Sequence, residues 1–158
     1  MTDSDSLKLD ITYVDIHELR FLLEQDYMVE QFDPEKVRVT FNMDTGYNLE
    51  TLVLAVDIVI HYLLIIEEVP TVLLEYHTRT EFEIKQLADQ IKNGVPTATV
   101  LYPAVDVAMN MTRGMMAVRT FGSSYRSSLP PLVDPLALIA PYLRFHAQAG
   151  KEIEKDGV

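Results

Sequence analysis

The chain contains no cysteine, and this absence removes several kinds of chemistry at once. Without thiols the protein has no disulfide bonds, no thiolate-ligated zinc or iron–sulfur centre and no cysteine nucleophile. Glycine is scarce, with 6 residues in 158, and no phosphate-binding Gly-x-x-x-x-Gly-Lys or Gly-x-Gly-x-x-Gly motif is present. The Gly-x-Ser-x-Gly elbow of serine hydrolases is also missing. We therefore expect a protein that is not an enzyme, although the missing motifs alone do not exclude one, and that needs neither a metal nor a cofactor.

Positive charge is also in short supply, because 13 Lys and Arg residues stand against 24 Asp and Glu residues. The formal net charge of −11 opposes binding to a phosphate backbone, so we expect no nucleic acid among the partners. Residues 1–79 hold 16 acidic and 5 basic residues, whereas residues 80–158 hold 8 of each. This asymmetry indicates either an acidic face directed at a basic partner or solvated strands that carry acids for solubility.

Long apolar runs are absent as well. The most apolar stretch, 52–66, is interrupted by Asp57 and His61 and is shorter than the roughly 20 residues of a spanning helix. Residues 1–6 are acidic and polar, unlike the basic start of a secretory signal. We therefore expect a cytoplasmic protein with no membrane insertion.

What the chain does contain is typical of one globular domain, with 48% apolar and 23% charged residues. The domain is expected over 7–145, after a flexible N-terminus at 1–6 and before a charged, loose tail at 146–158. Alternation of apolar and polar residues predicts four β-strands, at 7–15, 37–43, 51–64 and 72–84.

The segments between these strands are short, which indicates an antiparallel sheet. Residues 19–32 fit no regular period and are interpreted as an unusually apolar connection. Residues 44–48 and 67–70 contain turn-forming residues and are predicted to be turns. Both faces of the third strand are largely apolar, so a central position in the sheet is expected for it.

From residue 85 onwards the pattern changes to a helical one, after a short helix or strand end at 85–91. A long helix is predicted from Thr97 or Thr99 to about Phe121, with Pro103 in its first turn. A second helix begins at Pro135, with Asp134 as its N-cap. The predicted fold class is α+β: a four-stranded antiparallel sheet with a long helix and a C-terminal helix packed on one face.

Two groups of residues are candidates for function. His61, His77 and Glu75 lie on the third and fourth strands, where they would form either a metal or acid–base site or ordinary cross-strand neighbours. Four methionines lie within eight residues of the long helix, at 109, 111, 115 and 116. Flexible thioethers fill irregular cores, and they also suit surfaces that accept many different apolar partners.

The order of these features resembles the SecB family of protein-export chaperones. The sequence Leu101-Tyr102-Pro103 is similar to the family's Leu-Phe-Pro at the start of the long helix. The run from Leu129 to Leu136 (LPPLVDPL) is similar to its Leu-x-Pro-Val-Asn-Phe approach to the last helix, and the run from Leu9 to Ile16 (LDITYVDI) to its first strand. Arg113-Gly114 lies inside the long helix rather than at its end, so the chain resembles a divergent member of the family.

This resemblance implies an ATP-independent holdase that forms a dimer or tetramer. It also implies grooves that bind unfolded client segments and hand them to an export motor ATPase. The implied client-binding residues are Phe21, Leu22, Leu23, Tyr27, Met28, Phe32, Met109, Met111, Met115 and Met116. The implied docking residues on the acidic exposed face of the sheet are Asp10, Asp15, Glu18 and Glu75.

Two other interpretations remain open from the residues. One is a small-molecule-binding or enzymatic α+β domain that uses the histidine and glutamate group. The other is a dedicated adaptor for one partner, linked for example to a toxin–antitoxin pair or a phage. The long helix also carries a second apolar stripe, which includes Val107, Met111, Met115 and Val118. One sheet covers only one stripe, so we expect self-association through this helix and a sheet edge.

Overall fold

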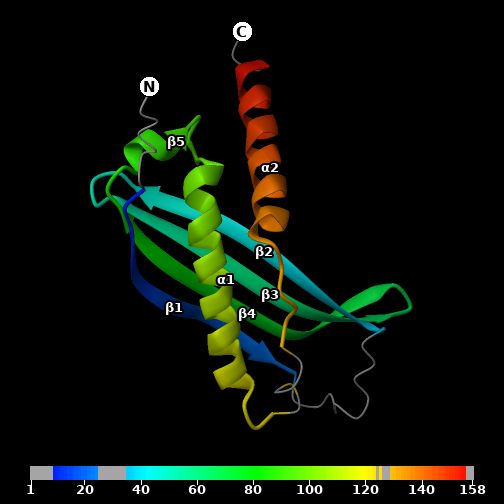
Figure 1. Cartoon of the computed structure of the whole chain (residues 1–158). Helices are drawn as coiled ribbons and strands as arrows, with labels where there is room; N and C mark the ends of the chain where they lie inside the picture. The colour runs from blue at the N-terminus through cyan, green and yellow to red at the C-terminus, as the bar shows by residue number, and fades with distance from the viewer. Residues whose placement is uncertain (1–8, 25–34, 124, 126–128, 156–158) are drawn as a thin grey trace, which may run out of the picture.

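The computed structural model describes residues 9–24, 35–123, 125 and 129–155, the last six by their backbone only. Its centre is a four-stranded antiparallel sheet in the order β1-β4-β3-β2. The strands are β1 (Ile11–Leu23), β2 (Val37–Asn48), β3 (Val53–Ile66) and β4 (Val69–Ile84). Two helices, α1 (Ala98–Thr120) and α2 (Pro135–Lys155), cross one face of the sheet, and the predicted fold class is confirmed (Figure 1).

The central strands β3 and β4 follow the predicted alternation closely. Every second side chain of β3 from Leu54 to Leu64 is buried beneath the helices, while the intervening ones are half-buried on the other face. Apolar residues on both faces place a strand in the middle of a sheet, where each backbone edge has a neighbour. The predicted central position of β3 is therefore confirmed, and β4 lies beside it.

Strand β2 is longer than predicted, and the turn predicted at 44–48 is wrong. These residues continue the strand in register with β3, from Asp44 opposite Asp57 to Asn48 opposite Val53. The chain reverses only afterwards, where the Asn48 side chain accepts the backbone N–H groups of Glu50 and Thr51. Pairing along the full length of β3 outweighs the local turn preference of the Asp-Thr-Gly sequence.

Strand β1 is also longer than predicted, because residues 19–23 of the expected connection belong to it. Two bulges, between Tyr13 and Asp15 and between Glu18 and Arg20, each insert one extra residue. Each insertion exchanges the two faces of the strand, so the two-residue alternation is lost in the sequence although the strand continues. Glu24 follows the strand and is the last described residue here. Residues 25–32 of the predicted connection lie outside the described residues.

The predicted short helix or strand end at 85–91 is a composite of small elements. It contains the 3₁₀ turn η2 (Ala88–Gln90), followed by a hairpin of β5 (Ile91–Lys92) and β6 (Val95–Pro96). The hairpin turns at Asn93-Gly94, with φ angles of 53° and 74°. These positive angles are the ones that an Asn-Gly pair adopts most readily in a two-residue hairpin.

Both helices begin where they are predicted to begin. The Asp134 carboxylate accepts the Leu136 backbone N–H at 2.9 Å, as an N-cap does. Pro103 is the sixth residue of α1 and therefore lies in the second turn rather than the first. Helix α2 continues through Lys155, so the loose tail predicted from residue 146 is wrong as far as that residue.

The core lies between the helices and the β3–β4 pair, while α2 packs over β2. One buried polar contact joins α1 to the sheet. The Thr112 hydroxyl donates to the Ala108 carbonyl at 2.7 Å and lies 2.6 Å from the Thr78 hydroxyl, which donates to it. Thr78 and Thr112 are fully buried and have no access to water, so each hydroxyl gives the other the hydrogen-bond partner that it needs.

Replacing Thr112 with valine is expected to lower the free energy of unfolding by about 1–3 kcal/mol, because Thr78 is left buried without a partner. The double variant Thr78→Val/Thr112→Val should recover most of the loss, since both hydroxyls are then gone. Urea unfolding of the two single variants and the double variant measures the coupling. Additive losses in the double variant would contradict the role assigned to this pair.

Candidate functional site

A groove with a volume of about 420 Å³ lies between α2 and β2. We call it the α2–β2 groove. Its floor comes from the helix-covered face of β2, and its outer wall comes from one side of α2. The lining residues are Phe41, Asn42, Met43, Asp44, Ala137, Leu138, Pro141, Tyr142, Phe145 and His146.

Tyr142 holds the two walls of this groove together. Its hydroxyl lies 2.6 Å from the Thr45 hydroxyl on β2, and its ring centroid lies 4.5 Å from that of His146. Burial raises the pKa of the Tyr142 phenol above its ordinary value. Phe145 is 67% exposed and contacts His146 edge to face, so a large apolar ring stands at the open side of the groove.

The groove runs beside an edge of the sheet. Strand β2 pairs with β3 on one side, and no other strand of the described residues pairs with it on the second side. Its twelve residues keep one uninterrupted register with β3, whereas the opposite edge strand β1 contains two bulges. A regular edge presents backbone donors and acceptors at even spacing, which is what an added extended segment needs.

The structure does not bring the predicted client-binding residues together in one groove. Met109 and Met116 are buried in the core under α1. Met111 and Met115 are half-buried on the side of α1 that faces β1. Three further residues of the prediction lie outside the described residues, namely Tyr27, Met28 and Phe32.

The three β1 residues of the same prediction separate between the two faces of the sheet. Phe21 lies on the helix-covered face, with its ring edge-on to Tyr76 at 5.7 Å and the Arg119 guanidinium 4.9 Å from its centre. Leu23 is half-buried against the same core, opposite Leu74. Leu22 points to the open face, opposite Glu75.

A second, smaller hollow of about 280 Å³ lies between β1 and α1. Gly114, Met115 and Val118 of α1 form its apolar wall. The other wall holds Glu18, which accepts hydrogen bonds from the Tyr76 hydroxyl at 2.9 Å and from Arg119 at 2.8 and 2.9 Å. This charge-assisted cluster joins the edge strand to the C-terminal turn of α1.

Glu18 therefore lies on the helix-covered face, and its predicted place among the acids of the exposed face is wrong. The bulge at Val14 shifts it there, because it exchanges the faces of all residues that follow. Asp15 lies on the open face, and Glu75 lies there half-buried, 3.1 Å from Arg20 and 3.5 Å from His61. Asp10 precedes the strand and forms an ion pair with Lys85 at 2.6 Å.

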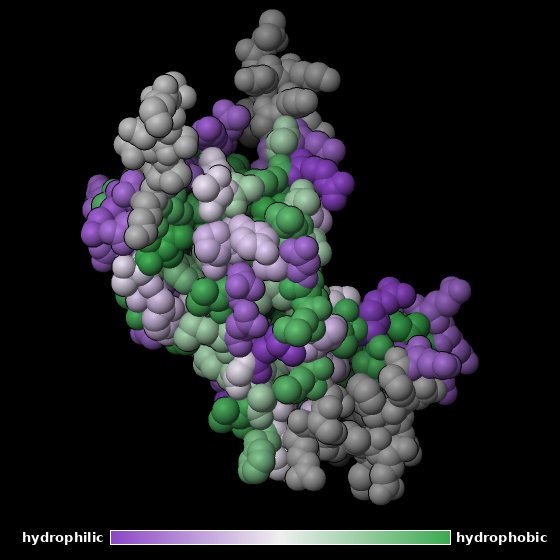
Figure 2. Space-filling view, in the orientation of Figure 1, coloured by the Kyte–Doolittle hydropathy of each residue, from purple (hydrophilic) through white to green (hydrophobic). Residues whose placement is uncertain are grey.

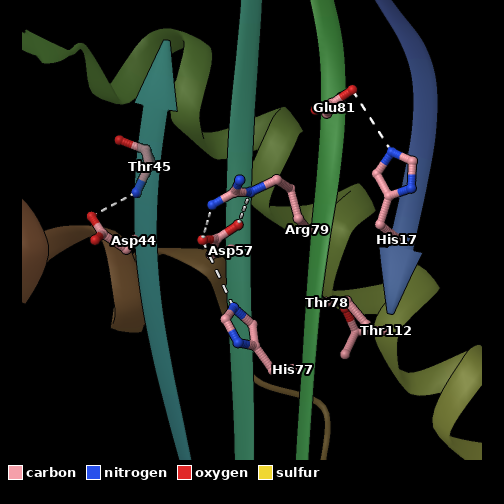
Figure 3. A network of polar contacts seen from close by, with 9 residues as sticks. All are labelled: His17, Asp44, Thr45, Asp57, His77, Thr78, Arg79, Glu81 and Thr112. Carbon is pink, nitrogen blue, oxygen red and sulfur yellow. Dashed lines mark hydrogen bonds and ion pairs between the residues drawn. The ribbon is translucent and has the colours of Figure 1, made fainter. Parts of the chain in front are cut away.

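The open face is a ladder of paired charges rather than a uniformly acidic surface. Figure 3 shows its centre, where Arg79 donates two hydrogen bonds to Asp57 at 2.7 and 2.8 Å. His77 approaches the same carboxylate at 3.8 Å, and His17 lies 3.9 Å from Glu81. Arg20 of β1 and Arg79 of β4 thus each pair with one acid of this face, and histidines lie beside others.

The alternative metal site at His61, His77 and Glu75 does not form. His61 lies beside Glu75, but His77 turns towards Asp57 instead. Within the described ranges, no group of three or more histidine and carboxylate side chains has the geometry to hold a metal ion. Nor is any helix of the described chain long and apolar enough to cross a membrane.

Comparison with known proteins rests on the fold alone. The sequence matches no protein-family profile and no curated protein. The structure matches that of the Mycobacterium tuberculosis Rv1957 SecB-like chaperone in complex with a ChAD peptide from the Rv1956 HigA1 antitoxin. The TM-score is 0.52 over 78% of this chain and 87% of that chain, at 16% sequence identity. The fold is SecB-like. The resemblance found in the sequence is thus confirmed at the level of fold.

Sequence reasoning missed the α2–β2 groove of this SecB-like fold. Phe41 and Met43 have the pattern of ordinary core residues of a strand, and Leu138 and Tyr142 that of the buried side of a helix. Phe145 was the one signal in the sequence. It is a large aromatic residue at a position of the helix outside the apolar stripe, and an exposed aromatic side chain can mark a binding surface.

The tyrosines of the site lead to a prediction about alkaline pH. Burial raises the pKa values of Tyr62, Tyr76 and Tyr142 above 10.0, and the Glu18 carboxylate raises that of Tyr76 further. The native state keeps these protons when the unfolded chain loses them. Stability from this source is therefore complete below pH 10.0 and falls as pH rises above it.

Urea unfolding over a pH series should show this decline, and the variant Tyr142→Phe should show a shallower one. Tyrosinate absorbance checks the same point directly, because the buried phenols should ionise only as the protein unfolds. Ionisation of all 8 tyrosines together in the folded state would contradict the prediction.

Proposed function

We propose that this protein is a chaperone or adaptor that binds an extended apolar segment of another protein in the α2–β2 groove. The observation that carries the proposal is the combination of a groove with large apolar side chains and a regular strand edge beside it that no other described strand pairs with. Side chains of a bound segment would enter the groove, while its backbone would pair with β2. This activity uses no cofactor.

The dimensions of the groove suit such a ligand. Its volume of about 420 Å³ lies within the range of roughly 300–1,000 Å³ typical of sites for small ligands. It accommodates a few side chains but not a folded domain. Phe145 offers the kind of large exposed ring that anchors an apolar segment. Met43 offers a flexible thioether side chain that adapts to different apolar partners.

The SecB-like fold supports this proposal by analogy, because Rv1957 is a chaperone whose structure contains a peptide of an antitoxin. Two finer versions follow. In one, the protein is a holdase for many unfolded clients and delivers them to an export motor ATPase. In the other, it is an adaptor for a single partner. We favour binding to one partner or a few, since three of the four acids expected to receive the motor, Asp10, Glu18 and Glu75, already form ion pairs within this chain.

A charge at the groove should weaken client binding. The variant Phe145→Asp is expected to weaken binding of an apolar peptide by about tenfold or more, which corresponds to about 1.4 kcal/mol. Phe145 is 67% exposed, so the stability of the fold should change little. Fluorescence titration with a labelled peptide measures binding, and light scattering of a denatured client such as citrate synthase measures holdase activity.

The matched control is Phe121→Asp, which places the same charge on an 81% exposed phenylalanine at the end of α1. It should bind the peptide like the wild type. Undiminished binding by Phe145→Asp would rule out the groove as the site. Protection of one partner but not of denatured citrate synthase would favour the adaptor over the holdase.

We also propose that the chain self-associates through α1. Val107 and Val118 are exposed, and Met111 and Met115 are only half-buried, so the described residues do not completely cover the second apolar stripe. The β1 edge lies beside this stripe and is free of other described strands. Its bulges limit regular pairing, so the helix stripe would supply most of the contact. A stable interface of this kind buries about 2,000 Å² or more.

Light scattering at low micromolar concentration should therefore give a mass above the 18.0 kDa of one chain. Met111→Glu or Met115→Glu should reduce it to one chain, because burying an unpaired carboxylate costs several kcal/mol. Thr99→Glu adds the same charge at an exposed position in the first turn of α1 and serves as the control. A wild-type species of 18.0 kDa would contradict self-association.

A further inference from the structure

The hairpin between β3 and β4 extends beyond the rest of the sheet, as Figure 1 shows. We call residues 66–72 the arm. Strand β1 ends its pairing at Leu74, and β2 begins its pairing at Leu64, so no other described strand flanks the arm. The arm lies outside the set of residues that line the α2–β2 groove.

Aliphatic side chains remain exposed on the arm. Ile66 and Val69, opposite each other next to the turn, are 55% and 62% exposed, and Val72 is 38% exposed. In Figure 2 the arm, at the right of the view, carries hydrophobic and strongly hydrophilic surface side by side. Apolar groups gathered on a projecting element are typical of an interaction surface.

The turn of the arm has a backbone that its residues do not favour. Glu67 and Glu68 have φ angles of 50° and 66°, the two positive angles of a tight hairpin turn. The same chain uses Asn93-Gly94 where the β5–β6 hairpin needs two such angles in succession. Side chains with a Cβ are strained there, and strain kept at a turn indicates that these side chains serve a purpose.

The charges of the two glutamates are also uncompensated. Several acids of the open face and of the β1–α1 contact have cationic partners, such as Arg79 for Asp57 and Arg119 for Glu18. Among the described residues, by contrast, neither Glu67 nor Glu68 forms an ion pair or a side-chain hydrogen bond. The arm contains no Lys or Arg, so two negative charges stand at the end of an aliphatic hairpin.

We propose that the arm is a docking element that inserts into an aliphatic groove of a partner protein whose rim carries lysine or arginine. Ile66, Val69 and Val72 fill the groove, and Glu67 and Glu68 meet the rim. The acidic excess of the first half of the chain thus acts through the arm rather than through the paired acids of the open face. This inference concerns a different surface from the client groove and stands independently of the proposed function.

The first test concerns the strained turn. The variant Glu67→Asn/Glu68→Gly gives the arm the turn sequence of the second hairpin, and it should raise the thermal midpoint by roughly 2–4 °C. It should also lose partner binding, because both charges are gone. An unchanged or lower midpoint would show that the turn is not strained and would overturn this part of the argument.

The second test uses the absence of cysteine from the chain, which makes an introduced thiol unique. Val69→Cys, labelled with benzophenone maleimide, is irradiated in an extract of the source organism. A single protein should be cross-linked, and excess unlabelled wild type should suppress the product. After purification, that protein should bind the wild-type chain and should bind Glu67→Lys/Glu68→Lys about tenfold more weakly.

The control is Glu50→Lys/Asp89→Lys, which makes the same change in net charge at exposed positions away from the arm. This control should bind the partner like the wild type. Added salt should weaken binding by the wild type but have little effect on binding by Glu67→Lys/Glu68→Lys. Any of three results would overturn the proposal. The first is that no cross-link is suppressed by unlabelled wild type, and the second is a cross-link to another copy of this chain. The third is equal partner binding by the two charge variants. The protein labelled at Val69→Cys should still bind the apolar peptide in the α2–β2 groove. If only Phe145→Asp loses peptide binding, the result concerns the proposed function and not the arm.

Discussion

The structure depends above all on the burial of one face of the β3–β4 pair beneath α1. Side chains such as Ile58, Ile60 and Tyr76 lose all contact with water there, and the transfer of this apolar area is the main stabilising contribution. Because α1 lies across both central strands, the edge strands and α2 are arranged around it. The buried Thr78–Thr112 pair adds a directional contact where apolar packing alone permits sliding.

Covering one face leaves the other to water, and the charges of the molecule follow from that. Asp57, Glu75 and Glu81 alternate with the buried residues of the central strands, the first two beside arginines and the third beside His17. Their side chains are only partly exposed, so the pairs avoid the cost of an isolated, partly desolvated charge. The two surfaces proposed to be functional, the α2–β2 groove and the arm, consequently lie at the borders of the sheet rather than on this face.

The elements that could be predicted from the sequence are those whose pattern is local. Examples are the alternation in β3 and β4 and the helix start at Asp134-Pro135. Each of these patterns identifies its element from residues that are close together in the sequence. The prediction failed at β1, where each bulge moves the alternation by one residue, and at Asp44–Asn48, where pairing with a distant strand decides. Neither effect is visible until the partner strand is known.

The candidate site was harder to predict for the same reason. A methionine-rich helix suggested an adaptable surface, but burial depends on what packs above each position, and two of the four methionines are in the core. The α2–β2 groove combines two elements about a hundred residues apart in the sequence, joined by Tyr142 and Thr45. The open-face acids looked available because Arg79 and Asp57 meet only when β3 and β4 pair.

The difference between the two edges of the sheet has a consequence for how the protein behaves at high concentration. A sheet with two regular edges can stack head to tail without limit, since each added copy recreates the edge it covers. Here β2 is regular while β1 is interrupted at Val14 and Leu19, so the two edges do not match. Stacking of the β1 edge of one copy on the β2 edge of the next is therefore disfavoured, which opposes growth of the sheet into a fibre.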